Sequence, residues 1–281
     1  MNSVLTLAVV ATVTAVIAIT MAIGRIRYRR RKASFRRIFN ALALPNVTED
    51  RCDVRQLILL PPPAGRYLRH ALPADGRLAR TVDLYLVGRI RPQPDAGWVG
   101  FEAHQRICPE RGFICESRLR GLGPITFEGA EYLFEQTAGS DFFLGRTLNL
   151  VREHGEALRR SAAARLLIES IWLPGALVPE GGVRWQPGDH QRATAVIPTT
   201  DGSVALSFVV AEDGALSEVS MMRHGDAAFG REQKAPFAFR VDDEASWDGN
   251  TVPSEVVGIW DHGTRAPFPF LHFRVENARY F

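Results

Sequence analysis

The sequence of 281 residues lacks the motifs by which most enzymes are recognised. It contains no Gly-x-Ser-x-Gly elbow, no Walker-type phosphate loop and no Gly-x-Gly-x-x-Gly between a strand and a helix, so hydrolases with that elbow and the common nucleotide-binding folds have no support. Its seven histidines show no His-Glu-x-x-His or His-x-His spacing. We therefore predict no catalytic residue, no metal and no cofactor, and a binding or interaction protein rather than an enzyme.

Cysteine is scarce as well, with only Cys52, Cys108 and Cys115. We expect Cys108 and Cys115 to flank a hairpin turn at residues 109 to 112 and to lie diagonally on one face, about 7 Å apart. That separation is too long for a disulfide. The pattern favours free thiols in a reducing compartment.

Acidic residues are missing before Glu49, and residues 4 to 23 carry no charge at all. At 1.5 Å per residue, such a helix is about 30 Å long, the thickness of the apolar core of a bilayer. A cleaved signal peptide has positive charge before its apolar core, whereas the side chains of Met1, Asn2 and Ser3 are uncharged. We predict a transmembrane anchor over residues 1 to 24.

Positive charge follows this apolar run immediately. Eight basic residues fall within residues 25 to 37: Arg25, Arg27, Arg29, Arg30, Arg31, Lys32, Arg36 and Arg37. The positive-inside rule predicts a single-pass protein of the cell (inner) membrane with a cytoplasmic C-terminal domain. These charges either contact anionic headgroups or act only as a topology signal. From residue 38 onward, 26 basic residues face 31 acidic ones, and an acidic body argues against nucleic acid as a partner.

An amphipathic segment connects the anchor to the body. Phe35, Ile38, Phe39 and Leu42 have helical spacing, and Pro45 ends the pattern. This helix either lies in the membrane interface or packs on the body. We assign residues 25 to 59 to a basic juxtamembrane segment and amphipathic linker, and residues 60 to 281 to one β-rich domain.

The body has the alternating pattern of antiparallel strands. The predicted strands cover residues 81–91, 97–107, 112–120, 125–136, 141–152, 191–198, 203–211, 215–223, 235–241, 252–261 and 268–280. A helix is predicted over residues 156 to 173, where Pro174 and Gly175 stop it. The predicted fold is therefore α+β, a mostly antiparallel curved sheet of about 11 strands forming a half-barrel around one central helix. A closed lipocalin-like barrel has no need of a mid-chain helix.

The helix also carries the most suggestive polar residues. Arg165 and Glu169 are four residues apart and share a face, with Trp172 beside them. This arrangement is either an ordinary helix pair beside a core tryptophan or part of a ligand site. The predicted ligand-binding residues are Arg165, Glu169, Trp172, Trp185, Asp189 and Arg223.

The same helix carries a resemblance to a known family. Residues 165–174 (RLLIESIWLP), 182–185 (GVRW), 60–63 (LPPP) with 66–67 (RY), 192–195 (RATA) and the end segment 252–273 resemble an uncharacterised bacterial family, domain of unknown function 6544. The resemblance covers roughly residues 60 to 281 and departs from the family pattern at residues 139 to 155. It implies no activity. Its sheet-around-helix layout is similar, by analogy, to the lipoprotein-carrier fold.

Three functions remain open. The first is a membrane-anchored module that binds a lipid or another hydrophobic molecule in its half-barrel. The second is a membrane-tethered interaction or scaffold protein, whose protein partner the sequence does not identify. The third is an enzyme, for which Glu169, Asp189, Arg223 and His224 are the candidate residues.

Overall fold

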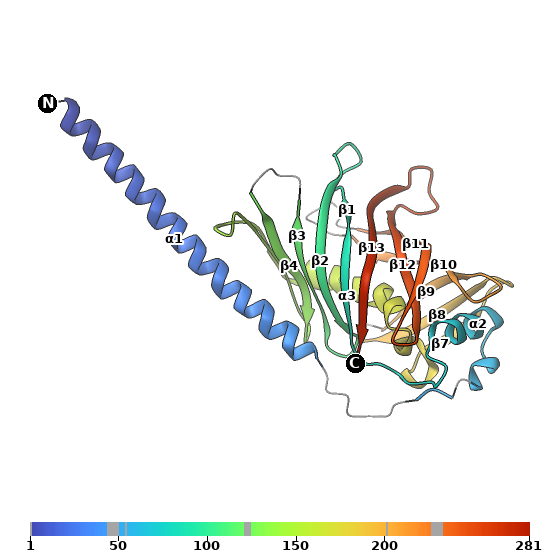
Figure 1. The fold of residues 1–281 in the computed structure, drawn as a ribbon. Helices are drawn as coiled ribbons and strands as arrows, with labels where there is room; N and C mark the ends of the chain where they lie inside the picture. The colour runs from blue at the N-terminus through green and yellow to red at the C-terminus, as the bar shows by residue number, and fades with distance from the viewer. Residues whose placement is uncertain (1, 44–50, 54, 121–124, 201, 226–232) are drawn as a thin grey trace.

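The computed structural model describes residues 2–43, 51–53, 55–120, 125–200, 202–225 and 233–281. A long helix leads into a curved sheet that holds a second helix on its concave side (Figure 1). The α-helices are α1 (Asn2–Leu42), α2 (Pro62–Ala71) and α3 (Glu156–Ile168), and the 3-10 turns are η1 (Gln56–Leu59), η2 (Glu169–Trp172), η3 (Pro174–Leu177) and η4 (Pro179–Gly181). The strands are β1 (Val82–Ile90), β2 (Val99–Cys108), β3 (Gly112–Leu119), β4 (Phe127–Phe134), β5 (Thr137–Leu144), β6 (Leu148–His154), β7 (Arg184–Pro187), β8 (Arg192–Thr199), β9 (Gly202–Val210), β10 (Leu216–His224), β11 (Lys234–Trp247), β12 (Asn250–Trp260) and β13 (Phe268–Tyr280).

All strands form one antiparallel sheet in the order β6-β5-β4-β3-β2-β1-β13-β12-β11-β10-β9-β8-β7. The sheet does not close, because β6 and β7 are its two edges. Helix α3 crosses the concave side and contacts β3 to β6 as well as β10. The predicted α+β half-barrel around one helix is confirmed, with 13 strands instead of about 11.

The two extra strands have local explanations. The strand predicted over residues 141 to 152 is a hairpin, β5 and β6, whose turn places Gly145 and Arg146 at φ values of 57° and 61°. A positive φ is common for glycine and rare for arginine, so the second turn residue gives no signal in the sequence. Strand β7 has only four residues and lies at the sheet edge, too short for an alternating pattern.

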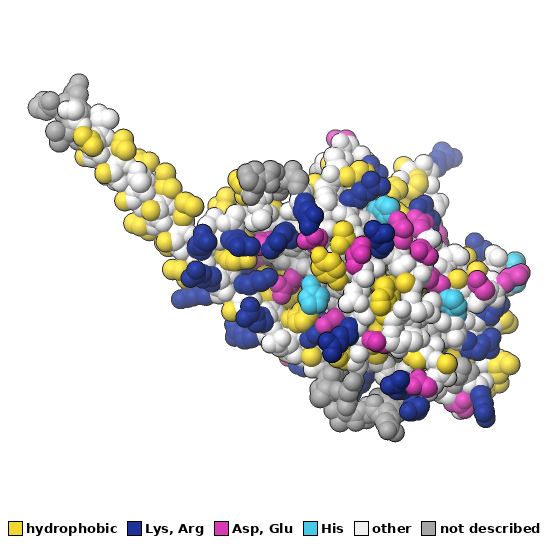
Figure 2. Space-filling model, in the orientation of Figure 1, with side chains coloured by type: hydrophobic (Ala, Val, Ile, Leu, Met, Phe, Trp, Pro, Cys, Tyr) yellow, Lys and Arg dark blue, Asp and Glu magenta, His cyan; other side chains and the backbone are white. Residues whose placement is uncertain are grey.

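Helix α1 is continuous from Asn2 to Leu42, so one helix crosses the predicted boundary at residues 24 and 25. Its described apolar side chains up to Ile23 are exposed, and by length and composition the helix is able to cross a membrane. Figure 2 shows this apolar half standing clear of the body, with Lys and Arg side chains gathered where the helix meets it.

The second half of α1 packs on the outer, convex face of β2, β3, β4 and β6. Phe35 and Leu42 of the predicted amphipathic stripe are buried there among Cys108, Ile114 and Tyr132. Of the two alternatives for this stripe, the structure has packing on the body. Pro45 lies outside the described residues.

The three cysteines are free and buried. Cys108 belongs to the small core under α1, whereas Cys115 belongs to the main core on the concave side. In the β2–β3 hairpin Cys108 pairs with Gly112, so Cys115 faces the opposite side of the sheet. The expected diagonal placement on one face is wrong, while the expectation of free thiols is confirmed.

Candidate functional site

Arg165 of α3 and Glu169 of η2, predicted as a helix pair, lie in a largely buried polar network on the concave side. The Nε of Arg165 donates to Glu169 Oε1 at 2.8 Å, and its Nη1 donates to Glu131 Oε2 of β4 at 2.8 Å. Gln105 of β2 accepts from Arg165 Nη2 at 3.1 Å and donates to Glu169 Oε2 at 2.6 Å. Sequence spacing identifies only the pair within the helix, because Gln105 and Glu131 come from distant strands.

The two carboxylates of the network stabilise the positive charge of Arg165. Burial disfavours the charged guanidinium of Arg165, but Glu169 and Glu131 outweigh this effect and raise its pKa above the ordinary arginine value. The guanidinium also lies 4.8 Å from the centre of the Phe113 ring. This half-buried cation, held by two carboxylates and an amide, fixes α3 on the sheet.

Trp172 is a core residue. Its indole N–H donates to the Pro253 carbonyl at 2.9 Å, and its ring packs against Phe239 and Phe273 at centroid distances of 5.4 and 5.6 Å. It therefore ties η2 to β12 and β13 within the main hydrophobic core.

The other three predicted residues lie apart from this network. Trp185 packs on Phe208 at 5.0 Å and donates to the Leu177 carbonyl at 3.0 Å. Asp189 is exposed and accepts from the backbone N–H groups of residues 191 and 192 at 2.9 and 2.8 Å, which makes it a turn residue. Arg223 lies over the rings of Phe237 and Trp260, at 4.8 and 5.2 Å. Of the six predicted residues, the structure thus brings together Arg165 and Glu169 and places the other four in separate surroundings.

An apolar row on the concave face was not singled out from the sequence. Register places five apolar side chains side by side, one from each strand from β2 to β6: Phe101, Leu119, Phe127, Leu144 and Leu148. They share the side of the sheet that carries Gln105 and Glu131, because they are an even number of residues away from them. We call these residues the apolar row.

Burial decreases along the apolar row from the centre of the sheet toward its edge. Phe101 is buried, Leu119, Phe127 and Leu144 are half-buried, and Leu148 is exposed. Phe142, one step deeper on β5, is also half-buried and stacks on Phe127 at 5.4 Å. Helix α3 and its network cover Phe113 and Cys115 instead, which are buried. The row is thus an apolar surface within the half-barrel that the central helix leaves partly open.

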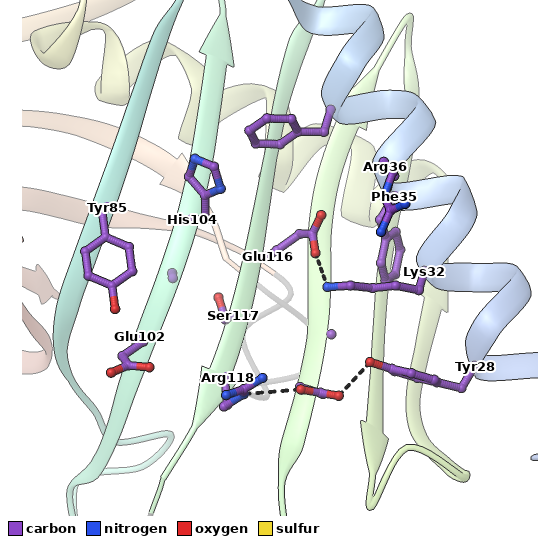
Figure 3. A pocket seen from close by; sticks show the side chains of 14 residues that line it. Tyr28, Lys32, Phe35, Arg36, Tyr85, Glu102, His104, Glu116, Ser117 and Arg118 are labelled. Atoms are coloured by element: carbon purple, nitrogen blue, oxygen red, sulfur yellow. Dashed lines mark hydrogen bonds and ion pairs between the residues drawn. The ribbon is translucent and has the colours of Figure 1, made fainter. Parts of the chain in front are cut away.

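A hollow of about 440 Å³ lies on the opposite, outer face, between α1 and strands β1 to β4 (Figure 3). Tyr28 and Lys32 of α1 form one wall, and His104 and Glu116 of the sheet form part of the other. Lys32 pairs with Glu116, and both Tyr28 and Arg118 bond Glu128. The contacts of Tyr28 and Lys32 cross the gap, so these residues fasten α1 to the sheet.

Glu128 is the electrostatic centre of that contact. Burial disfavours its charged form, but hydrogen bonds from the Tyr28 hydroxyl at 2.6 Å and Arg146 Nε at 2.6 Å hold its pKa below the ordinary glutamate value. Within the described residues, no group of three or more His, Cys, Asp or Glu side chains is placed to hold a metal ion.

A family model for "Family of unknown function (DUF6544)" matches residues 51–273. The chain belongs to this family. The match includes the Arg165 network and the apolar row, whereas Tyr28 and Lys32 of α1 precede it. The DUF6544 assignment agrees with the resemblance seen in the sequence. No curated protein matches the chain.

Several solved structures are similar to this DUF6544 chain at low identity. A LolA superfamily protein from Nitrosomonas europaea has 7% identity and a TM-score of 0.44, covering 77% of this chain and 90% of that one. A domain named for outer membrane lipoprotein sorting, from Vibrio parahaemolyticus, has 6% identity and a TM-score of 0.41, covering 71% and 85%. A DUF1329 family protein from Desulfovibrio piger has 10% identity and a TM-score of 0.40, covering 72% and 86%.

Proposed function

We propose that this protein is a membrane-anchored half-barrel that binds a lipid or another hydrophobic molecule on its concave face. The observation that carries this proposal is the apolar row, which lies inside an unclosed sheet and is only half-covered by the rest of the body. Large, half-exposed apolar side chains facing the inside of a sheet are costly in water unless something covers them.

The anchoring helix supports the same proposal. The apolar half of α1 is exposed, and its second half is fastened to the sheet, so the body is held beside the bilayer that we propose α1 crosses. The loops between β1 and β2 and between β12 and β13 lie at the end of the body toward which the N-terminal half of α1 extends (Figure 1). That end of the half-barrel then faces the source of lipid.

The predicted site residues have divided roles in this proposal. Arg165 and Glu169 hold α3 on the strands that carry the apolar row, Trp172 fixes η2 in the core, and Arg223 lies over its aromatic neighbours on the other half of the sheet. Asp189 and Trp185 shape turns and core at the far end. A hydrophobic ligand needs a shaped apolar surface more than it needs these charges.

Native mass spectrometry of the full-length protein, released from detergent micelles, tests this function. Phe127→Gln removes an aromatic ring from the apolar row, and Phe134→Gln makes the same change on the outer face of the same strand. We expect wild type and Phe134→Gln to retain a bound lipid at collision energies that strip the annular lipids, and Phe127→Gln to lose it. Equal lipid retention in all three proteins contradicts the proposal.

The second candidate is an interaction or scaffold protein. One observation favours it: the hollow of about 440 Å³ and a smaller one of about 270 Å³, beside Arg89, Glu255 and His272, both lie on the outer face of the sheet. A scaffold is expected to yield a stoichiometric protein partner on crosslinking in native membranes. It is expected to retain no lipid on the apolar row.

A further inference from the structure

The turn between β5 and β6 meets α1 at the residue where the apolar run ends. Gly24 follows Ile23 directly, and a β-carbon at Gly24 would stand 2.3 Å from the Thr147 carbonyl oxygen. Backbone therefore lies against backbone at this point. If α1 crosses a bilayer over its apolar half, the hairpin turn is at the depth of the membrane surface.

The same hairpin presents apolar side chains to the surroundings. Leu148 and Leu150 are 54% and 55% exposed, and Ile125, whose Cγ2 is 3.5 Å from a β-carbon built at Gly145, is 50% exposed. These three residues form what we call the hairpin patch. Three large exposed apolar side chains at one edge are unusual on a body that faces only water.

Charge around the hairpin patch suits a lipid surface. Between Asp141 and Glu153 the chain has no acidic residue, while Arg152 is exposed and Arg146 is exposed although it pairs with Glu128. On the adjacent turns of α1, Arg25, Arg27, Arg29 and Arg30 are exposed and make no ion pair with any described residue. Arg31 and Lys32, in contrast, are paired with Asp141 and Glu116 of the sheet. The basic cluster thus divides into two residues that fasten the body and others that face outward.

We propose that the hairpin patch is a second membrane contact, which inserts into the interfacial layer of the bilayer leaflet next to the body. The proposal rests on the membrane anchoring described under the proposed function. Leu148 is also the last member of the apolar row, paired with Leu144. An inserted hairpin therefore makes the row a continuous apolar path from the acyl chains to the concave face, along which a lipid enters.

Site-specific fluorescence of the full-length protein in vesicles of phosphatidylcholine and phosphatidylglycerol (3:1) tests this inference. Single cysteines are introduced as Leu148→Cys, Leu59→Cys and Val13→Cys and labelled with the polarity-sensitive dye NBD. The three native cysteines are buried, and the unmutated protein gives the background labelling. Leu59 is the matched control, a leucine that is 82% exposed on η1, which packs against α2. Val13 reports on the membrane span itself.

We expect quenching by lipids with a doxyl group on the acyl chain to reach both the Val13 and the Leu148 probes, with blue-shifted emission. The quenching of the Leu59 probe by soluble iodide should be several-fold stronger than that of the Leu148 probe. If the Val13 probe is quenched by lipid and the Leu148 probe behaves like that at Leu59, the second contact is refuted and the anchor stands. If the Val13 probe is quenched by iodide instead, the anchor fails, and this inference fails with it.

Discussion

The hydroxyl of Tyr28 donates a 2.6 Å hydrogen bond to Oε1 of Glu128, and this bond joins α1, one turn beyond its apolar half, to strand β4. Arg146, from the hairpin turn, donates to the same carboxylate oxygen. Helix α1, strand β4 and the β5–β6 turn therefore meet at one carboxylate. The ionised carboxylate thus contributes to holding the body against α1.

The first prediction concerns acid. Because the pKa of Glu128 is lower in the folded protein than in the unfolded chain, its contribution to stability is complete above the unfolded value of about 4.3 and is lost as the pH falls through the folded value. Tyr28→Phe removes a donor, so the free energy of unfolding should fall by about 1 kcal/mol at pH 7, and by less below about pH 4. Thermal unfolding of the full-length protein between pH 3 and 7 measures both effects.

Tyr85→Phe is the control for this prediction. Tyr85 is exposed and lines the same hollow from β1, so its loss should leave the pH dependence unchanged. A constant difference between Tyr28→Phe and wild type down to pH 3 would show that Glu128 is not the group responsible.

The second prediction concerns Gly24. An alanine in the middle of a helix is normally more stable than a glycine by about 0.5–1 kcal/mol. At Gly24 the Thr147 backbone occupies the space, and Gly24→Ala should therefore push the β5–β6 hairpin away from α1. We expect faster amide hydrogen exchange in residues 144 to 150 of that variant. Gly97→Ala, where no atom lies within 4 Å of the added carbon, should leave exchange in this segment as it is in wild type.

The third prediction concerns the buried network on α3. Arg165→Met leaves Glu169 and Glu131 without their cation, and breaking a buried pair costs about 3–5 kcal/mol of stability. Adding Glu169→Gln removes the more deeply buried of the orphaned carboxylates and should restore part of that loss. Thermal unfolding monitored by tryptophan fluorescence compares the single and double variants.

A solvent-exposed pair on the same helix provides the control. Arg160 pairs with Glu156, and both are exposed, so Arg160→Met should change stability by less than about 1 kcal/mol. If Arg165→Met is as mild as Arg160→Met, the network does not hold α3 on the sheet.

The fourth prediction concerns the thiols. Burial raises the pKa of Cys115, and burial together with Glu180 raises that of Cys52 to about 11. Because the thiolate is the reactive form, Ellman's reagent should react only slowly with the native protein at pH 8 and with all three cysteines after denaturation. Rapid reaction of a thiol in the native protein would mean that the core around it opens.

The fifth prediction concerns orientation. The basic residues that follow the apolar half of α1 favour the cytoplasmic side for the body. In a bacterial host, a C-terminal green fluorescent protein should fluoresce and a C-terminal alkaline phosphatase should be inactive. Active phosphatase together with a dark fluorescent fusion would place the body on the opposite side.

Much of this fold follows from sequence patterns, because the signals involved are local. The uncharged run at residues 4 to 23 and the alternation along β1 to β4 each depend on neighbours within a few residues. The helix predicted over residues 156 to 173 is α-helical only as far as Ile168, and 3-10 turns follow, the second of which begins at Pro174. The hairpin at Gly145 and Arg146 was missed because its second residue has a positive φ that arginine rarely adopts. Local sequence patterns do not show where the rest of the fold holds a residue in a backbone conformation that it rarely adopts.

The site was less accessible to sequence reasoning, since it depends on register. The pairing of Arg165 with Glu169 follows from helical spacing, but Gln105 and Glu131 become its partners only when β2 and β4 lie under α3. The apolar row likewise needs the register of five strands. The sequence of one strand does not show that its apolar residue lies beside an apolar residue of the neighbouring strand.

The central claim is that the apolar row on the concave face receives an acyl chain from the bilayer. Its most direct test is photo-crosslinking of the full-length protein in vesicles that contain a phospholipid with a diazirine near the end of its acyl chain, followed by peptide mapping. The account predicts labelled residues on the inner faces of β3, β4 and β5, around Phe127 and Phe142, in addition to labels on the apolar half of α1. Labels confined to α1 and the hairpin patch would contradict it.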